Sequence, residues 1–512
     1  MTRTSEDIGR GLAPARASRP IAPGERIHVI GVAGAGASAA ALLAGTAGAQ
    51  VTGCDPVGSS QYTPALDAAG IAVTPAHAAG HVVGPHGPLV DRVAATKALT
   101  SIAPDHPELA AAHAAGLPLE SWQQVVADAA ATHGGSLVGV AGTHGKSTST
   151  GWLVHLLAGA GRDPGAFVGA LMPAALTGGI PSTARWGGGD VFVVEADEYA
   201  GNFDPYRPDV AVLLNAEWDH PDVFRDEDAV LDAFEAWLRA PGADRRTLVA
   251  NVGDPGVERL YSRLGDWPGR IWLVHLGSDS DFGIANKVWH NTDGMVVGMP
   301  QEGQRLTIGG LPGEGLISGA QLGLPGRHNA ANAVCVAAAA AVLGVPADAI
   351  ARGLETFTGV GRRLELKGEP RGIAVYDDYG HHPTAIRASM AALRERHPGR
   401  RLWAVYEPLT YHRTAAMLDQ FADVMAEADE AVVADIWAGR DPDTTITSAG
   451  ALAEAIRGRG LAGATAPGSV EATADELARR VRTGDVVLVM GGGRSYVIAE
   501  RLVERLSSAD PE

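Results

Sequence analysis

Short apolar runs recur along the chain and alternate with stretches of helical periodicity. Three of these runs, at 136–141, 190–195 and 209–215, are almost uninterrupted, as expected for parallel strands buried on both faces. The first run leads through a glycine-rich turn into a stretch that places Trp152 and Leu156 at helical spacing. This alternation of strands and helices predicts an α/β fold with largely parallel sheets.

The same pattern divides the chain into three blocks behind a polar N-terminal segment. Residues 1–23 mix Arg, Ser, Pro and Gly without an apolar stretch, so we expect a mobile tail and not a signal peptide. Residues 24–131 begin as a Rossmann-like strand–helix–strand unit, and residues 132–356 carry the runs described above as a P-loop-type central domain. Residues 357–512 alternate strands and helices and predict a second Rossmann-like domain.

Within the blocks the pattern also predicts individual elements. In the last block we expect strands at 373–377, 402–406, 431–435 and 486–490. Helices are expected there at 384–396, 413–428, 451–457 and 495–507. Between 265 and 325, glycines and short alternating segments predict a small antiparallel sheet appended to the central block, and residues 131–135 are expected to form a linker.

Composition narrows the class of protein. The chain has 512 residues, of which 46% are hydrophobic and 20% charged, and these values are typical of a globular protein. Its net charge of −18 argues against a nucleic-acid or anionic-membrane binder, since both need a basic surface. No apolar run is long enough for membrane insertion, and two isolated cysteines, Cys54 and Cys335, indicate a reducing, cytoplasmic compartment. The sequence carries no signal for an oligomeric state.

The strongest candidate for chemistry is the loop that follows the run at 136–141. It consists of Gly142, Thr143, His144, Gly145, Lys146, Ser147 and Thr148. Between a strand and a helix, such a loop surrounds phosphates with backbone N–H groups, while a lysine supplies positive charge and a hydroxyl reaches Mg²⁺. The loop is shorter than the standard phosphate loop, which would have glycine in place of Val140. A glycine-rich turn without a ligand is the alternative.

Two acidic strand ends support the phosphate-binding interpretation. Glu195 ends one buried run, and Asp219 and His220 follow another. Because the carboxyl ends of parallel strands meet at one edge of a sheet, Ser147, Glu195 and His220 are expected to hold one divalent ion that bridges ATP phosphates. Each of these residues, taken alone, would also fit a solvated loop.

Two polar motifs further along the chain offer additional ligand contacts. Asn329 and Asn332 open an alanine-rich helix, and Asn329 fits either a helix cap or an amide that recognises adenine. Arg362 and Arg363 supply paired guanidinium groups suited to phosphate or carboxylate, or else form a solvated basic turn.

The segment 377–383, with the sequence DDYGHHP, lies between a predicted strand and a predicted helix. Its candidate site residues are Asp378, Tyr379 and His381. So many polar side chains are costly to bury without a function, although an exposed loop would also explain them.

A second glycine motif follows the first strand of the chain. It runs G-x-x-G-x-G from Gly31 and includes Gly34, Ala35 and Gly36, followed by Ser38; Asp55 ends the next strand. This order differs from the G-x-G-x-x-G of dinucleotide binders, which argues against a nicotinamide oxidoreductase. The motif fits a ligand that carries a pyrophosphate.

Taken together, these motifs resemble those of the Mur ligase family over essentially the whole chain. The matching segments are GTHGKSTST at 142–150, EADEY at 195–199, the pair Asp219-His220, RHNAAN at 327–332 and DDYGHHP at 377–383. The resemblance implies three domains that bind a UDP-sugar, ATP and an amino acid, in that order. It also implies an ADP-forming ligase of peptidoglycan precursor synthesis. In that reaction ATP phosphorylates the lactyl carboxylate of UDP-N-acetylmuramate, and an amino acid, expected to be L-alanine, attacks the acyl phosphate.

Roles for single residues follow from the resemblance. It implies that Mg²⁺ is bound by Ser147, Glu195 and His220. It implies catalytic roles for Lys146, His220, Arg363 and His381, the last two brought in by closure of the third domain. ATP contacts are implied for the loop from Gly142 to Thr148 and for Asn329, Asn332, Arg363 and Asp378. UDP-sugar contacts are implied for Gly34, Ala35, Gly36, Ser38 and Asp55, and amino-acid contacts for Tyr379, His381 and Arg413.

The chain departs from the family pattern where the amino acid is expected to bind. The alanine-adding branch usually has a histidine followed by an arginine, and this chain has Leu409 and Thr410. In addition, the segments 198–199 and 217–221 resemble those of a ligase that reattaches a recycled tripeptide. Three alternatives stay open: that recycling ligase, a homologue with another amine acceptor, and a non-catalytic homologue that binds a UDP-sugar.

Overall fold

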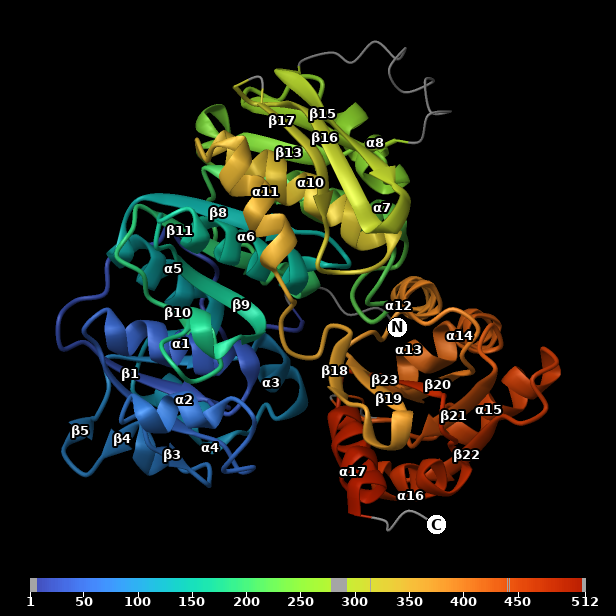
Figure 1. Cartoon of the computed structure of the whole chain (residues 1–512). Coiled ribbons are helices and arrows are strands. Elements are labelled where there is room, and N and C mark those ends of the chain that lie inside the picture. The colour runs from blue at the N-terminus through green and yellow to red at the C-terminus, as the bar shows by residue number, and fades with distance from the viewer. Residues whose placement is uncertain (1–6, 278–291, 314, 440, 442, 509–512) are drawn as a thin grey trace. The chain divides into compact units, whose positions relative to one another are not determined.

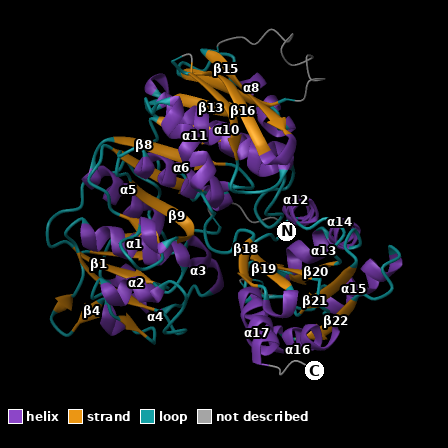
Figure 2. Cartoon of the chain, viewed as in Figure 1, coloured by secondary structure: helices purple, strands orange, loops and turns teal. Residues whose placement is uncertain are grey.

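The computed structural model describes residues 7–277, 292–313, 315–439, 441 and 443–508. These residues form two compact units, and strands and helices alternate in both (Figures 1 and 2). The first unit contains residues up to 219 together with 223–323 and 330–360. The second unit contains residues 220–222 and 324–329 and the chain from residue 361 onward.

The first unit begins with a five-stranded parallel sheet. Its strands, in spatial order, are β3 (Val73–Thr74), β2 (Gln50–Cys54), β1 (Arg26–Ile30), β6 (Arg92–Ala95) and β7 (Leu119–Ser121). Its main helices are α1 (Ala35–Thr46) and α5 (Trp122–His133). The shorter elements are α2 (Thr63–Ala68), η1 (Ala79–His81), β4 (Val83–Gly84), β5 (Gly87–Pro88), α3 (Lys97–Ile102) and α4 (Pro107–Ala114). This arrangement confirms the Rossmann-like start of the chain.

A ten-stranded sheet forms the centre of the first unit. Its order is β10 (Ser182–Arg185), β9 (Gly165–Met172), β11 (Val191–Ala196), β8 (Ser136–Ala141), β12 (Val210–Leu213), β13 (Thr247–Asn251), β14 (Arg270–Leu276), β15 (Gly294–Gln301), β16 (Arg305–Leu311) and β17 (Gly315–Gln321). The strands from β9 to β15 run parallel in this order. The associated helices are α6 (Lys146–Gly159), α7 (Glu227–Leu238), α8 (Pro255–Arg263), α10 (Arg327–Val342) and α11 (Ala347–Thr356).

The two sheets of the first unit share one hydrophobic core. Residues of β1 and α1 belong to the same buried cluster as Phe167 and Phe192 of the central sheet. The ring of Trp122, the first residue of α5, lies 5.3 Å from that of Phe167. The hydroxyl of Thr183 in β10 donates to the carbonyl of Ala35 in α1. The first two blocks of the sequence are thus packed together as a single body.

The residues before β1 make specific contacts. Ile21 is buried, and Arg16 forms ion pairs of 2.8 Å with Glu120 and 2.7 Å with Asp128. The mobility expected for residues 1–23 and the block boundaries at 131 and 356 stay predictions.

Two local expectations differ from the structure. Residues 131–133, expected to begin a linker, form the last turn of α5, and Gly134, with a φ of +80°, follows as its C-cap. The antiparallel strands expected between 265 and 325 exist as β15, β16 and β17, but they extend the central sheet and do not form a sheet of their own. Edge pairing to β14 explains this, because it satisfies backbone groups of β14 that a separate sheet would leave unpaired. Residues 278–291 of this segment lie outside the described part.

The second unit is a six-stranded sheet with helices on both faces. The strand order is β18 (Glu365–Gly368), β19 (Ala374–Asp378), β23 (Val486–Gly491), β20 (Leu402–Glu407), β21 (Glu430–Ala434) and β22 (Thr465–Gly468), and only β18 is antiparallel to its neighbour. One face is covered by α12 (Pro383–Arg396), α14 (Leu418–Met425) and α15 (Ala449–Gly458), and the other by α16 (Val470–Arg480) and α17 (Ser495–Ser508) (Figure 1). The doubly wound prediction is confirmed.

The single helix expected at 413–428 is divided in the structure. Its residues form α13 (Tyr411–Ala416) and α14, and Met417 between them has non-helical dihedral angles. The elements β18, β22 and α16 and the short 3₁₀ turn η6 (Pro370–Gly372) of this unit were not predicted.

Buried Asp485, which precedes β23, gives a pH-dependent contribution to stability. Its carboxylate lies 2.7 Å from Nη2 of Arg401 and accepts a hydrogen bond of 2.8 Å from the indole of Trp403. Burial alone would raise the pKa of Asp485, but the hydrogen bonds from Arg401, Arg482 N–H and Trp403 hold it below its ordinary value of 3.8. The charged form is therefore favoured by folding.

Asp485→Asn is expected to lower the unfolding free energy at neutral pH. A carboxyl whose folded-state pKa is depressed contributes stability above its unfolded pKa and loses it as pH falls through the folded value. The difference between wild type and variant, measured by denaturant unfolding, should therefore shrink as pH falls below 3.8. Asp67→Asn, at an exposed position of α2, is the control. A difference that stays constant with pH would contradict this account.

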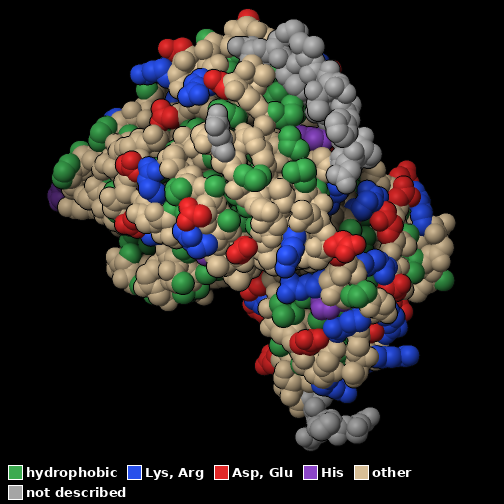
Figure 3. Space-filling model, turned by 45° about the horizontal axis from the view of Figure 1, so that its top comes forward, with side chains coloured by type: hydrophobic (Ala, Val, Ile, Leu, Met, Phe, Trp, Pro, Cys, Tyr) green, Lys and Arg blue, Asp and Glu red, His purple; other side chains and the backbone are tan. Residues whose placement is uncertain are grey.

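Among the described helices, none combines the length and apolarity that a bilayer crossing requires. On the face drawn in Figure 3, acidic and basic side chains of the described residues are interspersed.

Candidate active site

The predicted phosphate loop joins β8 to α6. Gly142 has a φ of +145° and Gly145, at the N-cap of α6, a φ of +79°. These values are accessible to glycine and strained for other residues. A Cβ on Gly142 would also lie 3.1 Å from the backbone of Asn215. The two glycines therefore allow the chain to turn sharply from the strand into the helix and leave the first N–H groups of α6 available to an anion.

Two residues that the sequence analysis did not single out hold this loop. Asn215 accepts a hydrogen bond of 2.7 Å from His144 N–H and donates through Nδ2 to the carbonyl of His144. Glu217 donates its backbone N–H to the hydroxyl of Thr143 and lies 3.0 Å from Nε2 of His144 through its carboxylate. Both follow β12, so the end of the neighbouring strand fixes the loop conformation.

Lys146, the first residue of α6, lies among carboxylates. Its Nζ is 2.7 Å from Oε2 of Glu198 and 3.4 Å from Oδ1 of Asp197. Burial alone would lower the pKa of Lys146, but Glu198 and Asp197 hold it above its ordinary value. The lysine is therefore a cation, as the binding of a phosphate requires. Glu198, which is also buried, was not predicted as its partner.

Ser147 and Glu195, two of the predicted metal ligands, are in direct contact. The hydroxyl of Ser147 donates a 3.0 Å hydrogen bond to Oε1 of Glu195, and Gly169 N–H donates to Oε2 at 2.6 Å. A hydroxyl and a carboxylate oxygen are ligands that suit a hard divalent cation. The third predicted ligand, His220, belongs to the second unit.

The two asparagines of the RHNAAN motif have different surroundings. Asn332 is close to the phosphate loop, since a Cβ on Gly145 would lie 2.8 Å from its Nδ2. Asn329 belongs to the second unit, where its Nδ2 donates to the carbonyl of Pro325 at 2.7 Å. Because α10 already begins at Arg327, Asn329 does not cap this helix, and that alternative is wrong.

The paired arginines 362 and 363 differ in burial. Arg362 is buried and binds the carboxylate of Asp377 at 3.1 Å and the hydroxyl of Ser495 at 2.7 Å. Arg363 lies with its guanidinium 4.8 Å from the ring centre of Tyr379. Arg362 is therefore a structural residue. Arg363 is the arginine of the pair that remains a candidate for ligand binding. Asp378 is held by the N–H groups of Leu364 and Gly380.

The predicted amino-acid-binding residues lie at the carboxyl ends of β19 and β20. Tyr379 and His381 are in edge-to-face contact with ring centres 5.3 Å apart. Arg413 is buried at the start of α13, and its Nη2 lies 3.0 Å from Nδ1 of His220. Thr410, one of the two departures from the family pattern, caps α13 with a φ of +63°, and Leu409 bridges to Trp437. The departures thus form part of the turn that positions Arg413.

The predicted UDP-sugar residues gather at the first turn of α1. Gly34 is the N-cap of α1, followed by Ala35 and Gly36, and the carboxylate of Asp55 accepts a hydrogen bond from Ala33 N–H. Ser38 is buried and lies 3.3 Å from the hydroxyl of Thr183. A Cβ on Gly36 would lie 2.2 Å from the ring of Trp122, so packing against α5 is sufficient to require this glycine.

Sequence models of one family match three successive parts of the chain. They are described as "Mur ligase family, catalytic domain" over residues 26–133, "Mur ligase middle domain" over residues 140–340 and "Mur ligase, glutamate ligase domain" over residues 362–493.

Curated relatives match most of the chain. An enzyme named UDP-N-acetylmuramate–L-alanine ligase from Roseiflexus sp. (strain RS-1) is 34% identical over 498 residues, which cover 94% of this chain and 98% of the relative. A protein of the same name from Clavibacter michiganensis is 37% identical over 486 residues, covering 94% and 93% of the two chains.

Solved structures share the fold. A murein peptide ligase from Psychrobacter arcticus superposes with a TM-score of 0.69 at 25% identity, covering 96% of this chain and all of that one. A UDP-N-acetylmuramate–alanine ligase from Thermotoga maritima superposes with a TM-score of 0.72 at 24% identity, covering 94% and 99%. By its matched domains and its relatives, the chain belongs to the Mur ligase family.

Proposed function

We propose that the chain is an ADP-forming ligase that joins L-alanine to the lactyl carboxylate of UDP-N-acetylmuramate in peptidoglycan precursor synthesis. The observation that carries the proposal is the pair Lys146 and Ser147 at the start of α6, in contact with Glu198 and Glu195. The relatives that cover almost the whole chain carry the name of this activity. We place the reaction in the cytoplasm, because it consumes ATP and both cysteines are free.

ATP is the phosphoryl donor in this proposal. The N–H groups of the loop from Gly142 to Thr148 and the ammonium of Lys146 bind its phosphates, and Asn332, beside Gly145, contacts the nucleotide together with Asn329. Phosphoryl transfer to the lactyl carboxylate releases ADP and leaves an acyl phosphate. Arg363, His381 and Asp378 of the second unit keep the roles that the family resemblance implies. The protein's task is to position the reactants and to stabilise charge.

Ser147 and Glu195 are the residues of the first unit that would hold Mg²⁺, and His220 is the third. The hydroxyl of Ser147 and the carboxylate of Glu195 fit the ion, because Mg²⁺ prefers oxygen ligands and these two groups already lie 3.0 Å apart. The imidazole of His220 is included because the family resemblance implies it. When bound, the ion neutralises charge on the phosphate oxygens.

For the UDP-sugar we propose the first turn of α1, with Gly34, Ala35, Gly36, Ser38 and Asp55. The N-cap of α1 is glycine and makes no side-chain cap, so its N–H groups suit a pyrophosphate. Asp55 is placed for a ribose hydroxyl by analogy with other Rossmann-like sites.

For the amino acid we propose Tyr379, His381 and Arg413. Arg413→Ala is expected to raise the KM for L-alanine about 10- to 100-fold, because a hydrogen bond to a charged group contributes about 1.5–3 kcal/mol. Initial rates at varied L-alanine concentration measure this effect. Arg387→Ala, which removes an exposed partner of Glu427 on α12, is the control, and an unchanged KM in Arg413→Ala would remove this residue from the site.

The activity is tested by phosphate release from ATP with Mg²⁺ and UDP-N-acetylmuramate. Single amino acids and the tripeptide L-alanyl-γ-D-glutamyl-diaminopimelate are supplied in separate reactions. Turnover with L-alanine supports the proposal. Turnover only with the tripeptide or another amine would assign the chain to the recycling or a specialised branch, and no turnover with any of them would overturn the ligase assignment.

A further inference from the structure

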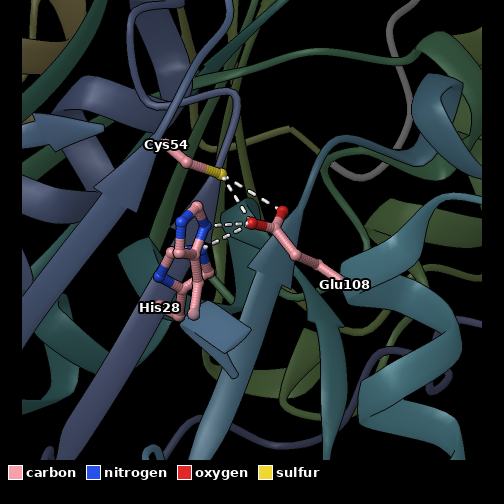
Figure 4. Close-up of side chains that lie close together, drawn as sticks. His28, Cys54 and Glu108 are labelled. Carbon is pink, nitrogen blue, oxygen red and sulfur yellow. Dashed lines mark hydrogen bonds and ion pairs between the residues drawn. The ribbon is translucent and has the colours of Figure 1, made fainter. Parts of the chain in front are cut away.

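A second group of metal-ligating side chains lies in the first sheet and its connections. His28 is on β1, Cys54 ends β2, His81 ends η1 and Glu108 is in the first turn of α4. Figure 4 shows His28, Cys54 and Glu108 pointing toward one another from these separate elements. None of them has a role in the proposed ligation.

The four candidate ligand atoms are close enough to share one ion. They are one ring nitrogen of each histidine, the sulfur of Cys54 and a carboxylate oxygen of Glu108, and they all lie within 4.8 Å of one another. Nδ1 of His81 lies 2.5 Å from Oε1 of Glu108, Nε2 of His28 lies 3.6 Å from it, and Sγ of Cys54 lies 3.2 Å from it. Ligand atoms around a tetrahedral zinc ion are about 3.3–3.8 Å apart, so adjustments of about 1 Å suffice.

Hydrogen bonding alone does not account for this cluster. Among the described residues, Nε2 of His28 and both ring nitrogens of His106 are buried without a hydrogen-bond partner. Most buried polar atoms of a folded protein have such a partner. In a structural network these nitrogens would be paired, whereas a cation between His28 and Glu108 would satisfy Nε2 of His28 directly.

The surrounding groups orient the four ligands. Nδ1 of His28 is 2.8 Å from the hydroxyl of Thr52 on the paired strand β2, which leaves Nε2 directed at Glu108. Ala78 N–H donates to Glu108 at 3.2 Å, and Nδ1 of His77 lies 3.1 Å from the sulfur of Cys54. Partners of this kind fix ring orientation and charge around metal ligands.

We propose that His28, Cys54, His81 and Glu108 bind a zinc ion in a four-coordinate site with a structural role. On binding, the thiol of Cys54 loses its proton to solvent, and the thiolate forms the bond to the ion. The other three ligands bind through a neutral imidazole nitrogen or a carboxylate oxygen and release no proton when they are already in those forms. Four protein ligands leave no open position for a substrate, which is the arrangement of structural zinc sites.

The donor set favours zinc over magnesium. Sulfur and imidazole nitrogen are ligands of zinc, whereas magnesium prefers oxygen atoms and retains its waters. The side chains of His77 and His81 are 21% and 22% exposed to solvent, so an ion can reach the cluster from that side.

The first test uses the full-length wild-type protein after dialysis against excess Mg²⁺. Elemental analysis is expected to find about one tightly bound zinc per chain. After removal of zinc with a chelator, cobalt(II) should restore a sulfur-to-metal charge-transfer band in the near ultraviolet, because a thiolate is among the ligands. Absence of the band, or absence of zinc together with no uptake on titration, would overturn the proposal.

Two cysteine variants form the second test. Cys54→Ser is expected to abolish the cobalt band and to weaken zinc binding at least about tenfold. Cys335→Ser, a matched change at the other buried cysteine, should leave the band and the zinc content unchanged. A band that persists in Cys54→Ser and disappears in Cys335→Ser would contradict the assignment. Circular dichroism verifies that both variants are folded. If Cys54→Ser does not fold, the cobalt spectrum of the wild-type protein alone decides whether a thiolate binds the metal.

Discussion

Replacing Lys146 with alanine is expected to lower phosphate release from ATP about 10²- to 10³-fold while UDP-N-acetylmuramate still binds. In the proposed ATP site, the ammonium at the start of α6 is close to the phosphoryl group on which charge develops during transfer. Loss of one such stabilising donor typically costs 10²- to 10³-fold in rate. The protein should remain folded. Without the lysine, Glu198 has a still greater tendency to be protonated, since burial already raises its pKa, and a neutral carboxyl is tolerated in that position.

Phosphate release and calorimetric binding of the UDP-sugar measure the two expectations separately. Lys367→Ala provides a matched control, because Lys367 pairs with Glu365 and Glu500 on β18 and α17 of the second unit. If Lys146→Ala turned over at the wild-type rate, the loop between β8 and α6 would not be the ATP site. If it lost UDP-sugar binding as well, the lysine would have a wider structural role than the one proposed.

Arg92→Met is expected to lower the free energy of unfolding by about 3–5 kcal/mol, because it leaves buried charge without a partner. The guanidinium of Arg92 is almost completely buried and lies 3.0 Å from Glu25, 2.9 Å from Glu120 and 2.5 Å from Asp128. Arg16 and Arg19 pair with the same carboxylates, but two cations cannot balance three anions in a region of low dielectric constant.

Denaturant unfolding of wild type and variant gives this difference. Arg26→Met serves as the comparison, since Arg26, the first residue of β1, forms an exposed ion pair with Asp91, the residue immediately before Arg92. This change should affect stability little. Equal losses for the two variants would show that burial of the ion pairs does not determine their contribution.

The sequence predicts the buried strands well because a continuous apolar run has few alternatives. The strand expected at 136–141 coincides with β8, and those expected at 402–406 and 486–490 end one residue short of β20 and β23. The edge strand β22 was missed, because its sequence TAPG contains proline and glycine and carries no apolar period. Pairing to β21 defines it, and such a tertiary contact is not visible in local sequence.

The candidate site shows the same difference between features that are visible in local sequence and features that depend on tertiary contacts. The strand–loop–helix pattern was enough to single out Lys146 and Ser147 and to expect Glu195 close to Ser147. Asn215 was missed because the residue that its side-chain amide contacts, His144, is 71 positions away in the sequence. Arg362 and Arg363 are adjacent and chemically alike, and only their burial in the folded chain separates a structural residue from a candidate ligand.

The shared core of the first unit has a consequence for how the protein can be divided. Helices α1 and α5 contact strands of the first sheet and strands of the central sheet. A fragment that ended at residue 131 would expose these apolar faces to water and would be prone to aggregate. The first sheet and the central sheet are therefore not interchangeable modules, and they should melt in one cooperative transition. Any exchange of the first sheet between relatives would have to carry the matching faces of β9 and β10 with it.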